Sequence, residues 1–567
     1  NTDDYKDDYM SRAHWVNALM GGSERLPDSV GLRIPVDMAL AFHSDAGVRD
    51  GDGIVGTLGI CYTRENGGKF VGGTDRYRSR DLTDLVQTQV VEDIRRTFEP
   101  GWQRRGLWNR AYYEARVPGV PTMLLELLSH QNFADMRLGS DPRFKFLVSR
   151  AVYKGILQYI SSQYGLPYVV QPLPVEAFSA EFTAADNVAL SWSPVMDPLE
   201  KSAAPTGYVV YTRVDDGGFD NGRPVDKPYL IVEQKPGHIY SYRVTAVNEG
   251  GESFPSETLS ACRVADEKGR VLIVNGFDRV SAPLSERSDS LAGFRMEIDG
   301  GVPDRQDISF VGAQHVFDLA QARCNVDSIA LGACGCDFET DVIGGNTFDY
   351  PALHGRSVAV AGYSFCSASL KAVERGEAAL EQYPAVDLIL GKQRTTTIGR
   401  GVQEPAFATF SPELQGALRR YLAGGGALFA SGAYVVSDLW AEEAPDAGRA
   451  FAEEVLHCAL DTGRAAERGR VRVMTAHKDF SRGEYRFNDE YRPDRYIVES
   501  PDALKPVGEG AFAVMRYVES GRTAGVACEA EGRTFVVGFP FESILSHTER
   551  DRLMRDALRF LLNENIR

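Results

Sequence analysis

The sequence predicts a multidomain protein in which two α/β units flank an all-β unit. The chain has 567 residues, more than one hydrophobic core accommodates, and a domain size of roughly 100–200 residues suggests about three domains. Helical and strand periods alternate in residues 1–165 and again in residues 268–567, as they do in α/β folds. Between them, residues 174–265 hold short alternating strands separated by turns rich in glycine, aspartate and proline.

The composition is that of an ordinary globular protein with an acidic balance. Hydrophobic residues make up 43% of the chain and charged residues 25%, which are usual proportions. The formal net charge of −17 argues against nucleic acid or an anionic membrane surface as a partner, since both attract an excess of lysine and arginine. No apolar run approaches the roughly 18–20 residues needed to cross a bilayer, so we expect no membrane span.

The first α/β unit, residues 1–165, begins with an amphipathic helix and a strand. Apolar and aromatic residues at spacings of four and three predict a helix from Tyr5 to Met20. The nearly unbroken apolar run from Ile34 to Phe42 predicts a strand buried on both faces. Further strands are expected at Leu58–Thr63 and Pro121–Glu126, and further helices at Leu82–Phe98 and Phe144–Ile156.

Two residues of this unit stand where chemistry is expected. His43 follows the first apolar run, and ligands bind at the carboxyl ends of strands in open α/β sheets. Glu126 ends the second run, where a carboxylate is costly to bury without a partner, a metal or a catalytic task. Each also has a structural interpretation, with His43 as a hydrogen-bonded residue at a strand end and Glu126 as a cap of the following turn.

Several successive segments of this unit resemble the zinc-dependent N-acetylmuramoyl-L-alanine amidases. The segments that carry the resemblance are Asp3–Asn17, Phe42-His43-Ser-Asp-Ala, Gly56-Thr-Leu-Gly-Ile-Cys-Tyr62, Ser79–Val90 and Pro121–Asn132, in the family's order. The resemblance implies one zinc ion held by two histidines and a glutamate, with a separate glutamate as acid and base. It makes His43 the last metal ligand and Glu126 the catalytic residue. The bond cut would be the amide between N-acetylmuramic acid and L-alanine in peptidoglycan.

Departures from the family pattern leave undecided whether the zinc site is complete. Two of the three expected ligands precede the helix that begins here near Asp3, so they would lie upstream of Asn1. His14 and His130 are the candidates for a substitute ligand within the chain, although neither occupies a ligand position of the family. The loop that follows Glu126 also differs from the family pattern, which leaves the shape of the substrate groove open.

The all-β unit, residues 174–265, resembles a fibronectin type III domain. Its expected strands include Ala189–Trp192, Gly207–Tyr211 and Tyr240–Asn248. The resemblance makes Trp192 the core tryptophan and Tyr240 the corner tyrosine, whose hydroxyl bonds to the backbone. Three prolines within Leu166–Pro174 predict a linker before this unit.

Residues 268–567 resemble flavodoxin-like and class I glutamine-amidotransferase-like domains. Apolar runs predict strands at Val271–Val274, Ser328–Leu331, Ser357–Ala361, Val386–Leu390, Ala427–Ala430 and Thr534–Gly538, and a helix at Pro412–Leu422. This alternation predicts a doubly wound parallel sheet.

Three motifs of this unit bear on its chemistry. Ser364 lies in Gly-Tyr-Ser-Phe-Cys, where Cys366 replaces the second glycine of a nucleophile elbow, so a binding or scaffold domain is favoured and a Ser364 hydrolase is the alternative. Cys334 and Cys336 lack a second cysteine pair, so we expect structural cysteines rather than a metal site. The loops at Gly276, Gly332 and Gly424–Gly426 do not form a Gly-x-Gly-x-x-Gly fingerprint, so no dinucleotide cofactor is expected.

The whole chain is similar to exported bacterial proteins labelled xanthan lyase-like, although it has no motif for lyase chemistry. We therefore expect a periplasmic or extracellular zinc-dependent amidase that acts on peptidoglycan or a related glycan or peptide polymer. The alternative is a non-catalytic protein that binds cell wall or glycan on an amidase fold, which an incomplete ligand set would permit.

Overall fold

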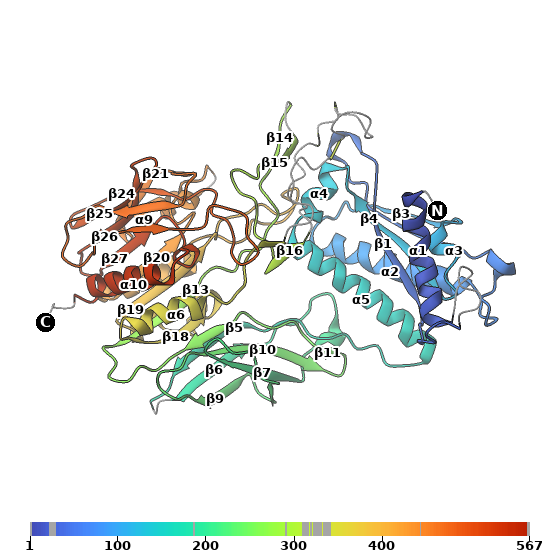
Figure 1. The fold of residues 1–567 in the computed structure, drawn as a ribbon, viewed down its shortest axis with the longest axis horizontal. Helices are drawn as coiled ribbons and strands as arrows, with labels where there is room; N and C mark the ends of the chain where they lie inside the picture. The colour runs from blue at the N-terminus through green and yellow to red at the C-terminus, as the bar shows by residue number, and fades with distance from the viewer. Residues whose placement is uncertain are drawn as a thin grey trace.

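The computed structural model describes the chain except residues 1–2, 22–29, 185–186, 290–291, 309–316, 318–319, 321–330, 333–341, 443 and 564–567. Figure 1 shows an N-terminal α/β unit, a β-sandwich and a C-terminal α/β unit. In the described part of the chain, no helix is long and apolar enough to span a membrane. Cys334, Cys336 and most of the strand predicted at Ser328–Leu331 lie outside the described residues.

The N-terminal unit is built on a four-stranded mixed sheet with the order β1-β4-β2-β3. Its strands are β1 (Ala39–Asp45), β2 (Thr57–Cys61), β3 (Arg104–Asn109) and β4 (Thr122–Ser129). β1 runs parallel to β4, while β2 is antiparallel to β4. The long helices α2 (Tyr77–Thr97) and α5 (Pro142–Tyr164) pack together on one face of this sheet.

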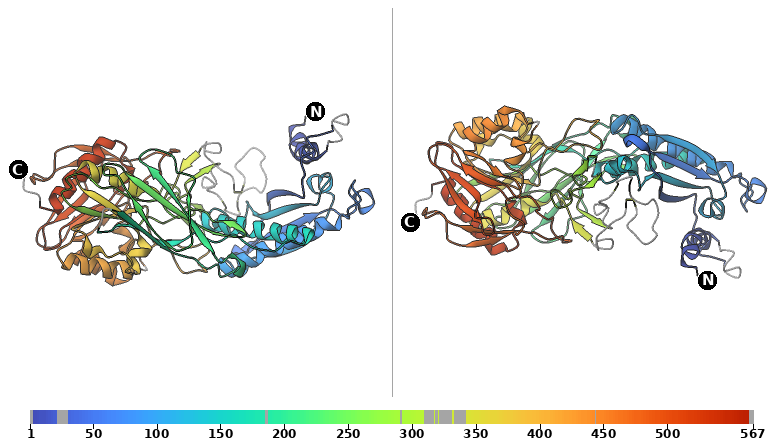
Figure 2. Two further views of the ribbon diagram at one scale, coloured as in Figure 1. Left: turned by 90° about the horizontal axis from the view of Figure 1, so that it is seen from below. Right: turned by 90° about the horizontal axis from the view of Figure 1, so that it is seen from above.

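The opposite face of the sheet is covered more sparsely. The short helix α3 (Tyr113–Arg116) packs against β2 and β4, and α1 (Asp4–Met20) packs against α3. Figure 2 shows that α1, seen nearly end on, stands off from the sheet. This face is therefore where the sheet of the N-terminal unit is open to ligands.

Three predicted helices of the N-terminal unit are confirmed as α1, α2 and α5. The expectation of a first strand buried on both faces is wrong. β1 begins only at Ala39 and lies at the edge of the sheet, where it pairs with β4 alone among the described strands. Phe42 is consequently 56% exposed. The apolar run indicated burial because sequence periodicity does not distinguish a central strand from an edge strand.

The β-sandwich consists of two sheets around one core. Its strands are β5 (Glu176–Phe182), β6 (Asn187–Ser193), β7 (Gly207–Val214), β8 (Arg223–Val225), β9 (Tyr229–Glu233), β10 (Tyr240–Asn248), β11 (Gly251–Glu252) and β12 (Leu259–Ala261). Trp192 is buried between Phe178 and Tyr208, as expected for the core tryptophan. The Tyr240 hydroxyl accepts a hydrogen bond from the backbone N–H of Lys235 at 3.3 Å, as expected for the corner tyrosine.

The C-terminal unit has a parallel sheet with the strand order β18-β13-β19-β20-β27. These strands are β13 (Arg270–Asn275), β18 (Ser364–Ser369), β19 (Ala385–Gly391), β20 (Ala427–Gly432) and β27 (Thr534–Val537). Antiparallel strands continue beyond β27, namely β26 (Thr523–Cys528), β25 (Ala511–Tyr517), β22 (Arg470–Val473) and β23 (Glu484–Arg486).

Helices cover both faces of this sheet, as a doubly wound arrangement requires. Helices α6 (Tyr350–Val360) and α10 (His547–Leu561) share one core with the sheet, while α7 (Leu370–Glu374), α8 (Pro412–Ala423) and α9 (Asp446–Glu454) share the other. The remaining regular elements are α4 (Phe133–Gly139), β14 (Ser285–Arg287), β15 (Ala292–Phe294), β16 (Gln306–Ile308), β17 (Val342–Gly344), β21 (Cys458–Thr462) and β24 (Ala503–Pro506).

One predicted strand of the C-terminal unit is wrong. Residues Ser357–Val360 belong to α6 rather than to a strand, and Ala361 is its C-cap. The run of valine and alanine has one buried face, with Val358 facing the core. A short apolar run of this length is ambiguous between a buried strand and a buried helix.

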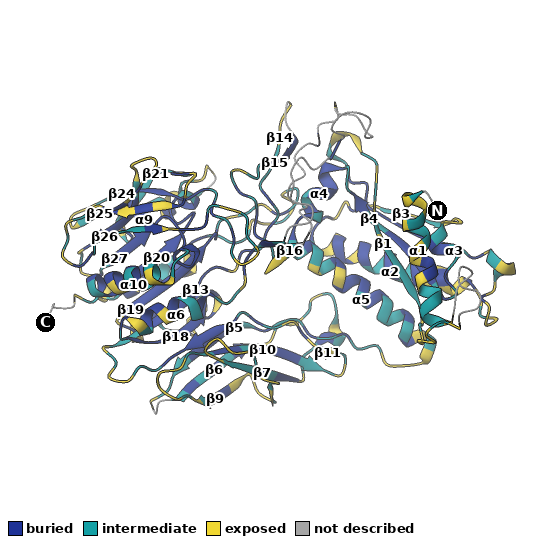
Figure 3. Cartoon of the chain, in the orientation of Figure 1, coloured by how far each residue is buried: buried dark blue, intermediate teal, exposed yellow. Residues whose placement is uncertain are grey.

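The three units contact one another through strand pairing and a shared hydrophobic core, in addition to the covalent chain. Antiparallel pairing of β5 with β18 fuses a sheet of the sandwich with the C-terminal sheet into twelve continuous strands. Phe294, Phe317 and Ile398, all from the C-terminal half of the chain, lie in the hydrophobic core of the N-terminal unit. Figure 3 shows that β5 and β18, which form the junction of the two sheets, are largely buried.

Candidate functional site

His43 and Glu126 lie side by side on neighbouring strands. They are register partners in the parallel pair β1 and β4, so their side chains leave the same face of the sheet. This is the face covered by α3, because Leu124, two residues before Glu126, packs against Ala115 of that helix. The structure thus brings the two residues predicted from sequence into one site.

His43 makes an ion pair with Glu114 of α3. The imidazole Nε2 lies 3.1 Å from a carboxylate oxygen of Glu114, and the two side chains are 26% and 11% exposed. Arg12 of α1 approaches the other oxygen of Glu114 at 3.3 Å. The hydrogen bond to Glu114 raises the pKa of His43. Burial alone would raise the pKa of Glu114, but His43 and Arg12 outweigh burial and lower it.

Glu126 is the least satisfied polar group of the site. One of its carboxylate oxygens, Oε2, is buried and has no hydrogen-bond partner. Burial raises the pKa of Glu126, and the negative charge of Asp45 adds to that rise. Asp45 itself is 2.6 Å from a guanidinium nitrogen of Arg105. A buried carboxylate whose pKa is raised and that lacks a structural partner is suited to proton transfer.

A cavity of about 520 Å³ opens beside His43 and Glu114, and Glu126 is not among the residues that line it. Its lining comprises Arg12, Ala13, Val16, Ala39, Leu40, Ala41, Phe42, His43, Ser44, Glu114, Pro118 and Thr122. Ala13, Val16 and Pro118 give this hollow an apolar surface next to the charged groups. A ligand in the cavity would therefore contact His43 and Glu114 directly.

The structure places the other histidine candidates in hydrogen bonds outside the His43–Glu126 pair. His14 is buried on α1, with Nε2 2.7 Å from the Tyr113 hydroxyl. His130 follows β4, and its Nδ1 lies 3.1 Å from the Ser44 hydroxyl. Among the residues that the structure describes, no group of three histidine, cysteine or acidic side chains is placed to hold a metal ion.

Sequence reasoning missed Glu114 and Arg12. Glu114 lies on a helix of four residues, which is too short to produce a periodic pattern. Arg12 is one of many charged residues on α1. A weak signal exists in Tyr112-Tyr-Glu-Ala-Arg116, where an acidic residue stands among aromatic and basic ones, but many exposed turns have the same composition.

The serine and cysteine candidates of the C-terminal unit are buried. Ser364 is 0% exposed at the amino end of β18, and its hydroxyl accepts a hydrogen bond from the Val264 backbone N–H at 2.9 Å. The alternative of a nucleophile that follows a strand is therefore wrong, because Ser364 begins one. The five described cysteines, including Cys366, are buried free thiols.

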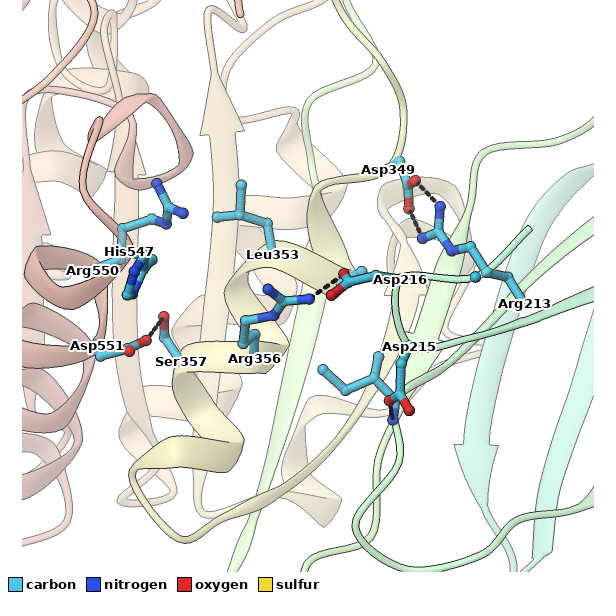
Figure 4. Close-up of a pocket in the computed structure, with 13 residues that line it drawn as sticks. Arg213, Asp215, Asp216, Asp349, Leu353, Arg356, Ser357, His547, Arg550 and Asp551 are labelled. Atoms are coloured by element: carbon cyan, nitrogen blue, oxygen red, sulfur yellow. Dashed lines mark hydrogen bonds and ion pairs between the residues drawn. The ribbon is translucent and has the colours of Figure 1, made fainter. Parts of the chain in front are cut away.

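A separate hollow of about 350 Å³ lies where the sandwich meets α6 and α10. Figure 4 shows that its charged side chains point toward one another. Arg213 binds both oxygens of Asp349 at 2.6 and 2.7 Å, and the Ser357 hydroxyl donates to Asp551 at 2.8 Å. The first contact joins the sandwich to the C-terminal unit and the second joins α6 to α10, which accounts for both without a ligand.

Comparisons with known proteins match parts of the chain. A titin homolog of Caenorhabditis elegans is 35% identical over 79 residues, which are 13% of this chain and 0% of the relative's length. The twitchin kinase region of C. elegans is 25% identical, with a TM-score of 0.15, over 17% of each chain. An N-acetylmuramoyl-L-alanine amidase from Clostridium difficile 630 is 16% identical, with a TM-score of 0.19, over 23% of this chain and 60% of that chain.

The sequence profile of the fibronectin type III domain matches residues 173–261. This range coincides with the β-sandwich, its buried Trp192 and its Tyr240 hydroxyl bond. The chain is thus a multidomain protein of mixed α/β and β content, and its residues 173–261 form a fibronectin type III domain.

Proposed function

We propose that the N-terminal unit hydrolyses an amide bond in peptidoglycan, with Glu126 as the general acid and base. The observation that carries this proposal is the pairing of Glu126 with His43 on one open face of the sheet, where Glu126 Oε2 is buried without a partner. The resemblance of residues 1–165 to N-acetylmuramoyl-L-alanine amidases supplies the substrate class. We further propose that the C-terminal unit is flavodoxin-like, because its parallel strand order corresponds to that fold.

The raised pKa of Glu126 supports the assigned role. Glu126 would take a proton from the attacking water as the new carbon–oxygen bond forms. It would then give that proton to the nitrogen of the leaving amine as the carbon–nitrogen bond breaks. A positioned general base of this kind contributes about 10²–10⁴-fold to the rate.

His43 is the residue that would bind zinc in this proposal. A catalytic zinc site takes three protein ligands, and the described residues offer no group of three that fits one. The resemblance implies that two further ligands would complete the site, and we assign no step of the reaction to the metal. Because peptidoglycan lies outside the cytoplasmic membrane, the same proposal implies that the protein is exported.

A second candidate function is binding of cell-wall polymer without hydrolysis. The engagement of His43 Nε2 by Glu114 at 3.1 Å favours it. An imidazole nitrogen held in an ion pair is less available to a metal. The fibronectin type III domain is compatible with either function.

The test measures zinc content and muropeptide cleavage for the protein in its full natural length, for His43→Ala and for Glu126→Gln. The proposal expects about one zinc per chain that is lost in His43→Ala, and cleavage that falls at least 10²-fold in Glu126→Gln. Glu92→Gln, on the exposed side of α2, is the matched control because its side chain is 53% exposed and far from the site in the fold. Retention on purified cell-wall polymer without any cleavage would support the binding function instead.

A further inference from the structure

A large cavity of the C-terminal unit lies at the carboxyl ends of β19 and β20. Its volume is about 760 Å³, within the range of roughly 300–1,000 Å³ typical of small-molecule sites. The loop after β19 contributes Arg394 and Phe410, and the loop after β20 contributes Tyr434 and Leu439. Ligands of open α/β sheets bind outside the carboxyl ends of the strands, so the cavity is where the fold places a ligand.

The walls of this cavity are mainly apolar. Phe410, Leu439 and Tyr434 are otherwise buried and line it from within, while Ala447 of α9 is exposed at its rim. Apolar walls with a few polar groups favour a ligand that has an apolar body. Burial of such a body against these rings and aliphatic chains removes apolar surface from water, which stabilises the complex.

A cluster of buried charges lies beneath the cavity, where β13 and β19 end. The Lys392 ammonium is 2.7 Å from Glu499, and the Arg279 guanidinium is 2.6 Å from Asp299, with all four side chains at most 5% exposed. Arg394 joins this cluster through Asp299 at 3.5 Å. Three cations therefore face two carboxylates, which leaves one positive charge in excess.

The Arg394 side chain places the excess positive charge at the cavity. Its side chain is 31% exposed, lines the cavity and stacks on the ring of Tyr434 at 5.0 Å. The carboxylate that it approaches, Asp299, already binds Arg279 at much shorter distance through the same oxygen. The planar fork of arginine matches a carboxylate or a phosphate.

The other charged groups of the lining bind elsewhere in the fold or lie at the rim. The Asp438 carboxylate accepts hydrogen bonds from the backbone and hydroxyl of Thr395 and from the Thr409 N–H, all at 2.9 Å. Glu442 is exposed at the rim, and Arg464 pairs with Glu467 at 3.5 Å. The first turn of α8 also borders the cavity through Pro412 and Gln415, and the amino end of a helix adds positive potential.

We propose that this cavity binds an amphipathic organic anion, with the apolar body against Phe410, Leu439 and Tyr434 and the carboxylate or phosphate head on Arg394. The site is independent of the function proposed for the N-terminal unit. The proposal gives the C-terminal unit a ligand-binding role at the carboxyl ends of β19 and β20.

Calorimetric titration of the full chain with decanoate, decyl phosphate and decanol tests this proposal. These probes share one apolar body, so they separate the two anionic heads from each other and from a neutral head. At least one anion should bind about tenfold or more tightly than decanol, because only the anions form a charge-assisted hydrogen bond with Arg394. Equal affinities for all three, or no binding of any, would overturn the proposal.

Two variants locate the binding. Arg394→Gln should reduce the affinity for the anion to that for decanol, whereas Arg420→Gln, 70% exposed on α8 outside the cavity, should leave it unchanged. Ala447→Trp should fill the cavity from its rim and abolish binding of every probe. Unchanged anion binding in both Arg394→Gln and Ala447→Trp would place the binding elsewhere and contradict the proposal. Circular dichroism of each variant confirms that it is folded.

Discussion

Ala180 of the fibronectin type III domain pairs with Ser367 of the C-terminal sheet. This pairing, together with that of Ser179 and Ala368, joins β5 to β18 and makes one sheet of two structural units. The Ser367 hydroxyl reinforces the junction, because it donates to the Ser260 carbonyl and accepts from the Ser260 N–H, both at 2.7 Å. The domain is therefore a structural extension of the C-terminal unit as well as a spacer.

Replacement of Ser367 by alanine should weaken this junction. The change leaves the buried N–H and C=O of Ser260 without the Ser367 hydroxyl, and an unsatisfied buried group costs about 1–3 kcal/mol. Hydrogen exchange of amides in β5, β12 and β18 should accelerate together. Ser162→Ala, which removes a hydroxyl that donates to the nearby Tyr159 carbonyl on α5, should leave that exchange unchanged. Acceleration confined to β18 would show that the two units are not coupled there.

The buried ion pair of Lys154 and Asp93 should be sensitive to the loss of one partner. The two groups are 2.5 Å apart between α5 and α2, with side chains at most 2% exposed. Lys154→Met should destabilise the N-terminal unit by about 3–5 kcal/mol because it leaves an uncompensated buried carboxylate. Hydrogen exchange of α2 and α5 amides measures the loss.

The double variant Lys154→Met/Asp93→Leu provides the control for this prediction. It removes both charges and replaces them with apolar groups, so it should recover most of the lost stability. If the double variant is as unstable as the sum of the two single changes, packing at this position rather than charge pairing determines the loss.

Glu126→Gln should stabilise the N-terminal unit while it removes the proposed activity. The carboxylate has a buried oxygen without a partner and a pKa raised by burial, so burial of this group opposes folding. Removal of such a group typically raises the free energy of unfolding by about 0.5–2 kcal/mol. Chemical denaturation of wild type and variant measures the change. A variant less stable than wild type would indicate that Glu126 has a structural role.

The sequence predicted this site in part. His43 and Glu126 were recognisable because each ends an apolar run, and parallel strands bring such ends together. Glu114 was not recognisable from the sequence, because it reaches His43 from a helix of one turn whose position depends on packing. The pairing of β5 with β18 was equally hidden, because register between strands nearly two hundred residues apart in the chain leaves no local pattern. The strand predicted at Ser357–Ala361 is wrong for a third reason. A short apolar segment fits a buried helix as well as a strand.

His354 should make the C-terminal unit lose stability as pH rises. Its imidazole is fully buried on α6, with Nδ1 2.8 Å from Asp387 and Nε2 3.2 Å from Glu542. Burial opposes its protonation, but these two carboxylates outweigh burial and raise the pKa of His354 to about 9. Because the folded-state pKa lies above the unfolded value, the stabilisation is complete below about pH 6.5 and is lost as pH rises through 9.

The thermal midpoint of wild type and of His354→Gln between pH 6 and 10 measures this effect. Wild type should lose on the order of 3 kcal/mol across the range relative to the variant, whose amide does not titrate. Burial also raises the pKa of Glu257 to about 8 and that of Asp502 to about 7. Both groups lower stability with rising pH in the same direction, and both are present in wild type and variant alike. The difference between the two curves therefore isolates His354, and parallel curves would show that the buried imidazole stays neutral throughout.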